Sequence, residues 1–275
     1  MRKSIAIIIT SILVLSGCNK QQSVSDRLLN EVGKAIAINP DSASNLLKSI
    51  SSPEKLDDKT FARWCMLSGK ITDEIFNSIL PTYQLERAYD WYSSHGSPDE
   101  QVQILIYLGR SYFADGDYDK AMSIYTNALD IAEKNKLNNL IGYTYDYIGD
   151  LYREKFMRTE AIKRYEIAAE YFKKEKNTDS YACALRDIGR EYAQMDSLSH
   201  ALNILIIADS VAANTSNINV TASINNALGN IYSMQNKYDK AEEYLLKALL
   251  TGREKMPDYV ALIDLYTTSN SINKA

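Results

Sequence analysis

The sequence predicts an all-α protein, a helix-turn-helix solenoid with repeats of about 40 residues. First, a set of Gly, Tyr and Ala positions recurs every 40 residues from Gly109 onward. Second, apolar residues recur at the spacing of one helix face, as in Leu105, Leu108 and Tyr112. Third, the 275 residues include only 11 Gly and 5 Pro, too few for a turn-rich all-β protein.

The composition is that of an ordinary globular protein. The chain is 45% hydrophobic and 24% charged, which excludes a disordered or collagen-like chain. Its 31 Lys and Arg against 35 Asp and Glu give a formal net charge of -4, whereas a dedicated nucleic-acid binder would carry a basic excess. We therefore expect no nucleic-acid partner.

The first residues read as a secretion signal. Arg2 and Lys3 precede an apolar run of eleven residues from Ile5 to Leu15, too short for a bilayer span of about 20 residues. The run ends in Leu15-Ser16-Gly17-Cys18, which resembles the lipobox of bacterial lipoproteins. This resemblance implies a signal peptide at residues 1–17, lipidation of Cys18 and a lipidated tether at 18–23. The alternative is a plain secretory signal with an incidental Cys.

The residues after Cys18 bear on the destination. Asn19, Lys20 and Gln21 follow it, and no acidic residue occurs before Asp26. Acidic residues just after the Cys are typical of surface-exposed lipoproteins in some Gram-negative groups, and an adjacent Asp is typical of inner-membrane retention. We therefore expect a lipid-anchored protein of the cell envelope, on the periplasmic face of the outer membrane.

Residues 24–97 predict degenerate helical repeats. Leu28–Ile38 and Ser42–Ile50 form a helical pair broken at Asn39-Pro40, and a further helix contains Trp64, Leu67, Ser68 and Ile71. Its partner helix begins at Pro81, a favoured first helical residue. Ser97-Pro98-Asp99-Glu100 then predicts a capping box that opens the next helix.

Residues 98–256 predict four regular repeats, each a helix, a short turn and a second helix. A Gly in the middle of a helix costs about 1 kcal/mol relative to Ala, so its recurrence indicates that another helix approaches closely there. The recurring positions are Gly109, Gly149, Gly189 and Gly229 in the first helix, with Tyr112, Tyr152, Tyr192 and Tyr232 three residues later, and the pairs Ala121/Ala128, Ala161/Ala168, Ala201/Ala208 and Ala241/Ala248 in the second.

This pattern resembles the tetratricopeptide repeat (TPR) family, whose helix A carries W-x2-L-G-x2-Y and whose helix B carries spaced Ala and an aromatic residue. The resemblance covers Leu105 to Ala248 and implies a right-handed superhelix, as in TPR lipoproteins of Gram-negative bacteria. The unit departs from the family in having 40 residues instead of 34 and no closing Pro. We expect the extra residues to lengthen the helices and the turns around Asn135–Asn139 and Asn214–Asn219.

Residues 257–275 predict a final helix that begins at Pro257 and carries Tyr259, Leu262 and Tyr266. No second helix is predicted to follow it. We expect a capping helix that shields the last repeat, as solenoids require. The alternative is that the chain is a truncated part of a longer protein.

The TPR resemblance also implies a binding surface. In that family the concave groove is lined by helix A residues three before, one after and four after the repeat Gly, and the first two of these share a face. We expect an extended protein segment to lie there, with its acidic part near Arg186 and Arg190. The alternative is a solvated face with internal Asp–Arg pairs. The predicted binding residues are Arg110, Phe113, Asp146, Asp150, Arg153, Arg186, Arg190, Asn226 and Asn230.

Motifs for catalysis are missing. The sequence contains no G-x-S-x-G, P-loop, dinucleotide-binding or H-E-x-x-H pattern. His95 and His200 fall at helix ends in different repeats, and Cys65 and Cys183 are three repeats apart, so we expect neither a metal site nor a disulfide. We predict no enzymatic activity, no cofactor and no small-molecule substrate.

Two function classes remain. The first is a lipid-anchored scaffold that binds a protein or peptide of the cell envelope. The second is the sensory ectodomain of a TPR-type regulator. The motif Asp41-Ser42-Ala43-x-x-Leu46-Leu47 resembles such ectodomains, and this alternative requires that the chain is truncated before a membrane and signalling domain.

The lipobox yields a direct test. Cys18→Ser should abolish incorporation of labelled fatty acid and leave the precursor uncleaved or wrongly processed, because the modified thiol is gone. Metabolic labelling followed by electrophoresis measures both effects. Release of the wild-type chain as a soluble protein without an acyl chain would contradict the assignment.

Overall fold

The structure is a computed structural model that describes residues 24–75, 79–252 and 255–269. Every regular element in these ranges is a helix, so the expected all-α fold is confirmed. The proposed signal peptide and Cys18 lie outside the described residues. Among the described helices, none is long and apolar enough to cross a membrane.

The chain divides into two compact units, residues 1–131 and 132–275, here called the N-terminal and C-terminal units. In the described part of the N-terminal unit, a helix at residues 24–35 is followed by α2, a short 3-10 turn, α3, α4, α5 and most of α6. Their bounds are Pro40–Lys48, Pro53–Lys55, Asp58–Ile75, Thr82–His95, Pro98–Ala114 and Tyr118–Lys134. Consecutive helices α2 to α5 pack on one another.

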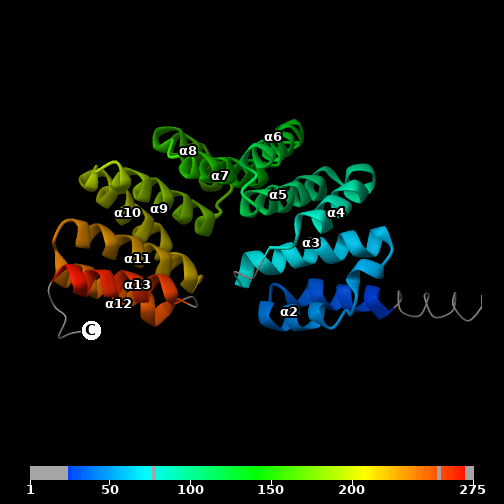
Figure 1. The fold of residues 1–275 in the computed structure, drawn as a ribbon, viewed down its shortest axis with the longest axis horizontal. Coiled ribbons are helices and arrows are strands. Elements are labelled where there is room, and N and C mark those ends of the chain that lie inside the picture. Colours follow the sequence, from blue (N-terminus) through cyan, green and yellow to red (C-terminus); the bar gives the residue numbers. More distant parts are fainter. Residues whose placement is uncertain (1–23, 76–78, 253–254, 270–275) are drawn as a thin grey trace, which may run out of the picture. The chain divides into compact units, whose positions relative to one another are not determined.

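The described part of the C-terminal unit contains α7 to α13, in which each helix contacts the next along the chain. Figure 1 shows α9, α11 and α13 side by side. The second-next helices α9 and α11, both first helices of a repeat, also touch. The bounds are Asn138–Glu154, Arg158–Lys174, Thr178–Gln194, Leu198–Ala212, Ile218–Met234, Tyr238–Thr251 and Met256–Thr268.

The 40-residue spacing follows from helix length. Helices α5 to α9 and α11 each have 17 residues, and α5 to α10 are joined by turns of three residues. The extra residues therefore lengthen the helices. Of the two turns expected to be long, only the one at residues 213–217 is, whereas the turn at residues 135–137 has the common three-residue length.

The starts of α4 and α5 follow the capping signals in the sequence. Ser97 and Glu100 form the predicted capping box, in which each side chain bonds to the backbone N–H of the other residue. Pro81 is the N-cap of α4, one residue before the helix itself begins.

Cys65 is buried and Cys183 half-buried, and both are free thiols.

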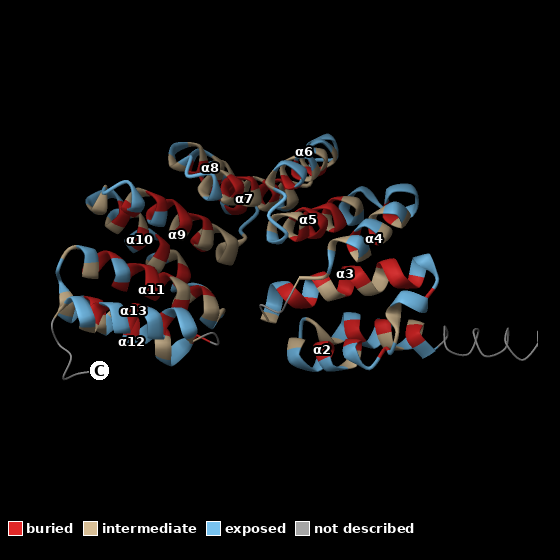
Figure 2. Cartoon of the chain, viewed as in Figure 1, coloured by how far each residue is buried: buried red, intermediate tan, exposed pale blue. Residues whose placement is uncertain are grey.

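The repeat glycines lie where the second helix of each repeat crosses the first. A Cβ atom placed on Gly149 would stand 2.5 Å from the Tyr165 ring, and one on Gly229 would stand 2.6 Å from Leu245. Real Cβ contacts are longer than this, so only Gly fits. Tyr165 is 0% exposed. In Figure 2 the buried residues lie along the helix faces that meet neighbouring helices.

This close crossing predicts the effect of adding one methyl group. Gly149→Ala should lower the free energy of unfolding by about 1–3 kcal/mol, because the buried Tyr165 ring has no space to move into. Gly33→Ala is the matched control: its added Cβ would be 3.8 Å from the nearest atom, Leu67 Cδ2, and the helical preference of Ala should make it neutral or stabilising by up to about 1 kcal/mol. Urea unfolding measures both. Equal effects of the two substitutions would show that Gly149 is not at a close crossing.

Candidate functional site

The two predicted binding residues of the N-terminal unit are tied into their surroundings. Arg110 forms an ion pair with Asp73, and its guanidinium carbon lies 5.9 Å from the centre of the Tyr107 ring. Phe113 is half-buried, and its ring lies 5.4 Å from that of Tyr118. These contacts join neighbouring helices and leave little of Arg110 accessible.

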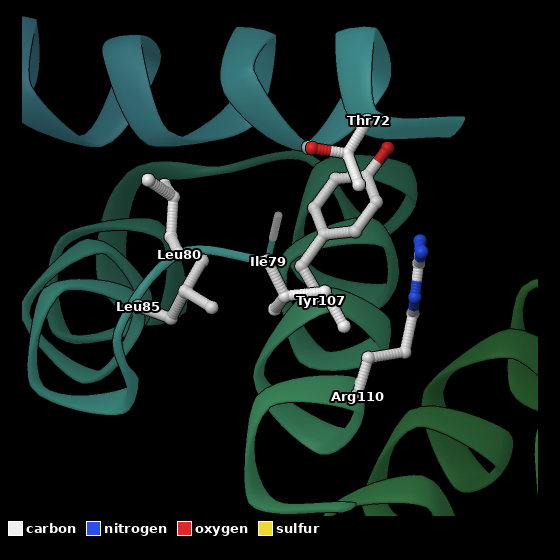
Figure 3. Close-up of a pocket in the computed structure, with 7 residues that line it drawn as sticks. Thr72, Ile79, Leu80, Leu85, Tyr107 and Arg110 are labelled. Carbon is white, nitrogen blue, oxygen red and sulfur yellow. The ribbon is translucent and has the colours of Figure 1, made fainter. Parts of the chain in front are cut away.

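Arg110 also borders a small cavity (Figure 3). The Tyr107 ring extends across it toward Thr72, and its hydroxyl donates a hydrogen bond to Asp73 Oδ2 at 3.0 Å. The space amounts to about 10 Å³, which holds about one water molecule. The cavity is therefore a packing gap, not a ligand site.

The C-terminal unit contains a much larger groove, with about 760 Å³ of space. This volume lies in the range of ligand-binding clefts. The groove is bordered by the first helices of three repeats, by the turn that precedes α8 and by α13. Its lining residues are Arg153, Glu154, Phe156, Arg158, Asp187, Arg190, Glu191, Ala193, Gln194, Ala227, Asn230, Ile231, Ser233, Met234, Ala261 and Asp264.

Three of the predicted binding residues, Arg153, Arg190 and Asn230, line this groove. The other four predicted in this unit, Asp146, Asp150, Arg186 and Asn226, do not. They lie in α7, α9 and α11 and form hydrogen bonds, ion pairs or buried contacts within the protein, as described next.

Asp150 is held between two neighbours. It accepts a hydrogen bond from the Tyr165 hydroxyl at 2.8 Å and pairs with Arg153 Nη1 at 2.8 Å. Tyr165 belongs to α8 and reaches this face of α7 by lying across Gly149. One turn earlier, the Oδ1 atom of Asp146 is buried and accepts no hydrogen bond. Two closely spaced carboxyl groups thus lie on α7, outside the lining of the groove.

Both carboxyl groups have raised pKa values. Burial is the main cause for Asp150, whose pKa rises to about 6 although Arg153 opposes the shift. Burial also raises the pKa of Asp146 well above its usual range, and the negative charges of Asp150 and Asp187 add to the effect. Burial disfavours the charged form of a carboxyl, which is why both shifts are upward.

Asp187, which the sequence analysis did not select, is the central anion of the site. Arg186 grips it through two hydrogen bonds of 3.0 and 2.7 Å. Burial raises the pKa of Asp187, but the charge of Arg186 and these bonds outweigh burial and lower it. Arg186 also donates to Ser223 in α11 at 2.9 Å. Arg186 therefore supports the groove floor instead of facing a ligand.

Arg190 is the least neutralised cation of this group. Within the described part of the chain it forms one ion pair, with Asp187 at 3.5 Å, and Arg186 already holds the same carboxylate at 2.7 Å. Its side chain is 43% exposed, against 18% for Arg186. Partial loss of hydration around its guanidinium and the positive charge of Arg186 lower the pKa of Arg190 to about 10. It is still charged at neutral pH, and an anionic ligand would relieve the repulsion.

The amide pair at the far side of the groove is only partly available. Asn226 is 7% exposed and donates to Asp258 Oδ1 at 2.7 Å, which joins α11 to α13. Asn230 donates to Asn226 Oδ1 at 3.0 Å. Asn226, a predicted binding residue, is therefore buried, and its side chain forms hydrogen bonds within the protein.

A further ion pair joins α8 to α9 beside the groove. Arg158 Nη1 lies 2.8 Å from Glu191 Oε2, and Glu191 is 2% exposed. Neither Arg158 nor Glu191 occupies a predicted groove position. For the neighbouring pair of Asp187 and Arg190, the spacing of three residues along one helix was a signal that the sequence offered. This Arg–Glu pair joins α8 to α9, whereas the Asp–Arg pairs of Asp150 and Asp187 each lie within one helix.

The raised pKa of Asp150 predicts a pH effect. An acid whose pKa rises on folding adds stability below its unfolded value, about 3.9, and this stability is lost as the pH rises through about 6. Asp150→Asn should therefore gain stability relative to the wild type between about pH 4 and 6. Urea unfolding across this range measures the difference, with Asp239→Asn in α12 as the surface control. A constant difference at every pH would contradict the buried carboxyl assignment.

Comparison with known proteins identifies the repeat type. Residues 102–135 and 221–256 each match a family model described as tetratricopeptide repeat. The photosystem I assembly protein Ycf3 of Rippkaea orientalis (strain PCC 8801 / RF-1) is 32% identical over 91 residues, or 32% of this chain. The match spans about half of that relative, 52% of its length.

Solved structures resemble the chain over most of its length. A Rap protein complexed with competence and sporulation factor aligns with a TM-score of 0.66 at 16% identity, over 88% of this chain and 80% of that one. A signal transduction ATPase of Pyrococcus horikoshii with a tetratricopeptide repeat sensor aligns with a TM-score of 0.59 at 20% identity, over 90% and 37% of the two chains. Identities this low show the fold alone. The chain is thus an all-α protein that carries tetratricopeptide repeats.

Proposed function

We propose that this protein is a lipid-anchored scaffold of the cell envelope, which binds an extended segment of another protein in the groove of the C-terminal unit. The observation that carries the proposal is Arg190, a partly exposed cation on the groove wall whose nearest carboxylate is already held by Arg186. An acidic side chain of the bound segment would complete its pairing.

The dimensions and the lining of the groove support a protein ligand. Its 760 Å³ would take several residues of an extended chain, and its wall mixes charged groups with the apolar residues Ala193, Ile231 and Met234. Tetratricopeptide repeat proteins typically bind proteins or peptides. The structurally similar Rap protein was solved in complex with competence and sporulation factor. We assign the protein no enzymatic role, cofactor or small-molecule substrate.

The cellular address in this proposal depends on the N-terminal sequence. Lipidation of Cys18 would fix the chain to a membrane, and the residues after it favour the periplasmic face of the outer membrane. The partner would then be a protein or peptide of the envelope.

A sensory role is the second candidate. It is favoured by the structural likeness to the ATPase whose tetratricopeptide repeats are described as a sensor. Sequencing the DNA downstream of this gene distinguishes the two. A membrane helix followed by a regulatory domain in the same reading frame would favour the sensor, and a stop codon after Ala275 would favour the scaffold.

The contacts of each groove residue decide which of them can be replaced without loss of structure. Replacing Arg186 or Asn226 would remove hydrogen bonds to Asp187, Ser223 or Asp258, so lost binding could reflect lost structure. Arg190 and Asn230 line the groove and make fewer such contacts. Arg164 of α8 does not line the groove and provides a charge-matched control.

The test combines Arg190→Gln with Asn230→Ala. Affinity capture with the envelope-anchored chain identifies the partner, and we expect the double variant to bind it about tenfold or more weakly, whereas Arg164→Gln binds normally. Thermal melts confirm that both variants are folded. Capture of the same partner at unchanged affinity by the folded double variant would overturn the groove proposal.

A further inference from the structure

The turns between the two helices of each repeat share one backbone conformation. The residue seven after each repeat Gly has a positive φ, between 57° and 80°. Gly tolerates this region freely, and Asn and Asp enter it more readily than other residues. Three of the four repeats follow this rule, and one does not. The four residues are Gly116, Phe156, Asp196 and Asn236.

Phe156 is the exception among these four, and of the described residues only Lys136 and Lys176, in the turns between repeats, combine the same φ of 57° with a long side chain. The φ of Phe156 is 57°, a region in which a bulky side chain is strained. Its side chain gains little burial in return, because the residue is 79% exposed. The Arg158 guanidinium carbon lies 5.7 Å from the centre of its ring, but Arg158 is already paired with Glu191. A Gly or Asn at this turn would satisfy the backbone better.

Its location separates Phe156 from other exposed apolar residues. Phe156 lines the groove, on the same wall as Arg153 and Arg158. The next residue, Met157, is 46% exposed, whereas the equivalent residues Asp117, Ser197 and Lys237 are polar. An apolar pair therefore replaces polar turn residues only in the repeat whose turn borders the groove.

We propose that Phe156 is the apolar anchor of the groove, and that the bound segment combines an acidic side chain, paired with Arg190, with a large apolar side chain that packs on Phe156. This inference rests on the proposed function and specifies the class of ligand. We attribute the retained backbone strain at Phe156 to binding. The ring is shielded from water only when the segment is bound, so it contributes to affinity and not to folding.

The lining charges favour a protein segment over a lipid surface. Glu154, adjacent in sequence to the turn, and Asp264 of α13 also line the groove and would repel anionic headgroups. A protein segment can place its acidic group at Arg190 and keep apolar atoms beside Phe156. It can also extend over Ile231 and Met234, which line the groove too.

The test uses random dodecapeptides displayed on phage, selected on the mature wild-type chain and counter-selected on the Arg190→Gln/Asn230→Ala variant. We expect the enriched peptides to share an acidic and a large apolar residue at constant spacing. Synthetic copies of these peptides are then titrated against purified variants by fluorescence anisotropy.

The decisive variant is Phe156→Asn, which introduces the residue present in the fourth repeat. It should raise Tm by about 2 °C through relief of backbone strain and weaken the selected peptides about tenfold. Leu250→Gln is the control for apolar exposure, since Leu250 is 82% exposed and lies outside the groove lining. It should leave peptide affinity unchanged.

A double-mutant cycle identifies the contact itself. Replacing the apolar peptide residue by Ala should weaken binding to the wild type about tenfold but have little effect on Phe156→Asn, because the two side chains act as a pair. Additive losses would overturn the proposed contact, and so would a lower Tm for Phe156→Asn.

The outcomes separate this inference from the proposed function. Selected peptides that bind Phe156→Asn normally but lose affinity for the Arg190→Gln/Asn230→Ala variant would overturn the anchor and leave the groove as the binding site. Failure to enrich any peptide on the wild type over that variant would overturn both. A defect of Phe156→Asn confined to binding of phosphatidylglycerol vesicles would assign the residue to a membrane surface and overturn the anchor.

Discussion

The architecture depends on the close crossing of two helices at each repeat glycine. Where a side chain is absent from the first helix, a large residue of the second helix lies across it and is fully buried, as Tyr165 does over Gly149. The same crossing brings the Tyr165 hydroxyl to Asp150, which in turn pairs with the groove residue Arg153. Packing and site geometry in this repeat therefore have a common cause.

Most of the charged side chains around the groove are buried or half-buried and paired within the protein. Arg186 and Asp187 neutralise each other, Arg158 neutralises Glu191, and the two carboxyl groups of Asp146 and Asp150 are held with raised pKa values. Such pairs cost desolvation energy and add little net stability. What they leave is Arg190, whose carboxylate partner Asp187 is already held by Arg186.

The sequence predicted the fold more completely than the site. The Gly positions, the capping box at Ser97 and the helix at Pro257 follow from local rules, and each has its counterpart in the structure. The predicted binding residues were chosen by their offset from the Gly, and three of them, Arg153, Arg190 and Asn230, line the groove. The same offset also selected Asn226, which instead bonds to α13, an element outside the repeat pattern.

The sequence alone determined the helical repeat, because its period and its small residues are properties of one helix and its neighbour along the chain. Tertiary structure decided which polar groups remain available. Asp187 is central because arginines of its own helix, Arg186 and Arg190, and Arg153 of α7 all act on its carboxylate. The significance of Phe156 likewise needed two facts absent from the sequence, its positive φ and its place on the groove wall. The positive φ belongs to the local turn, whereas the place on the groove wall arises from the packing of several helices, which residue spacing along one chain does not encode.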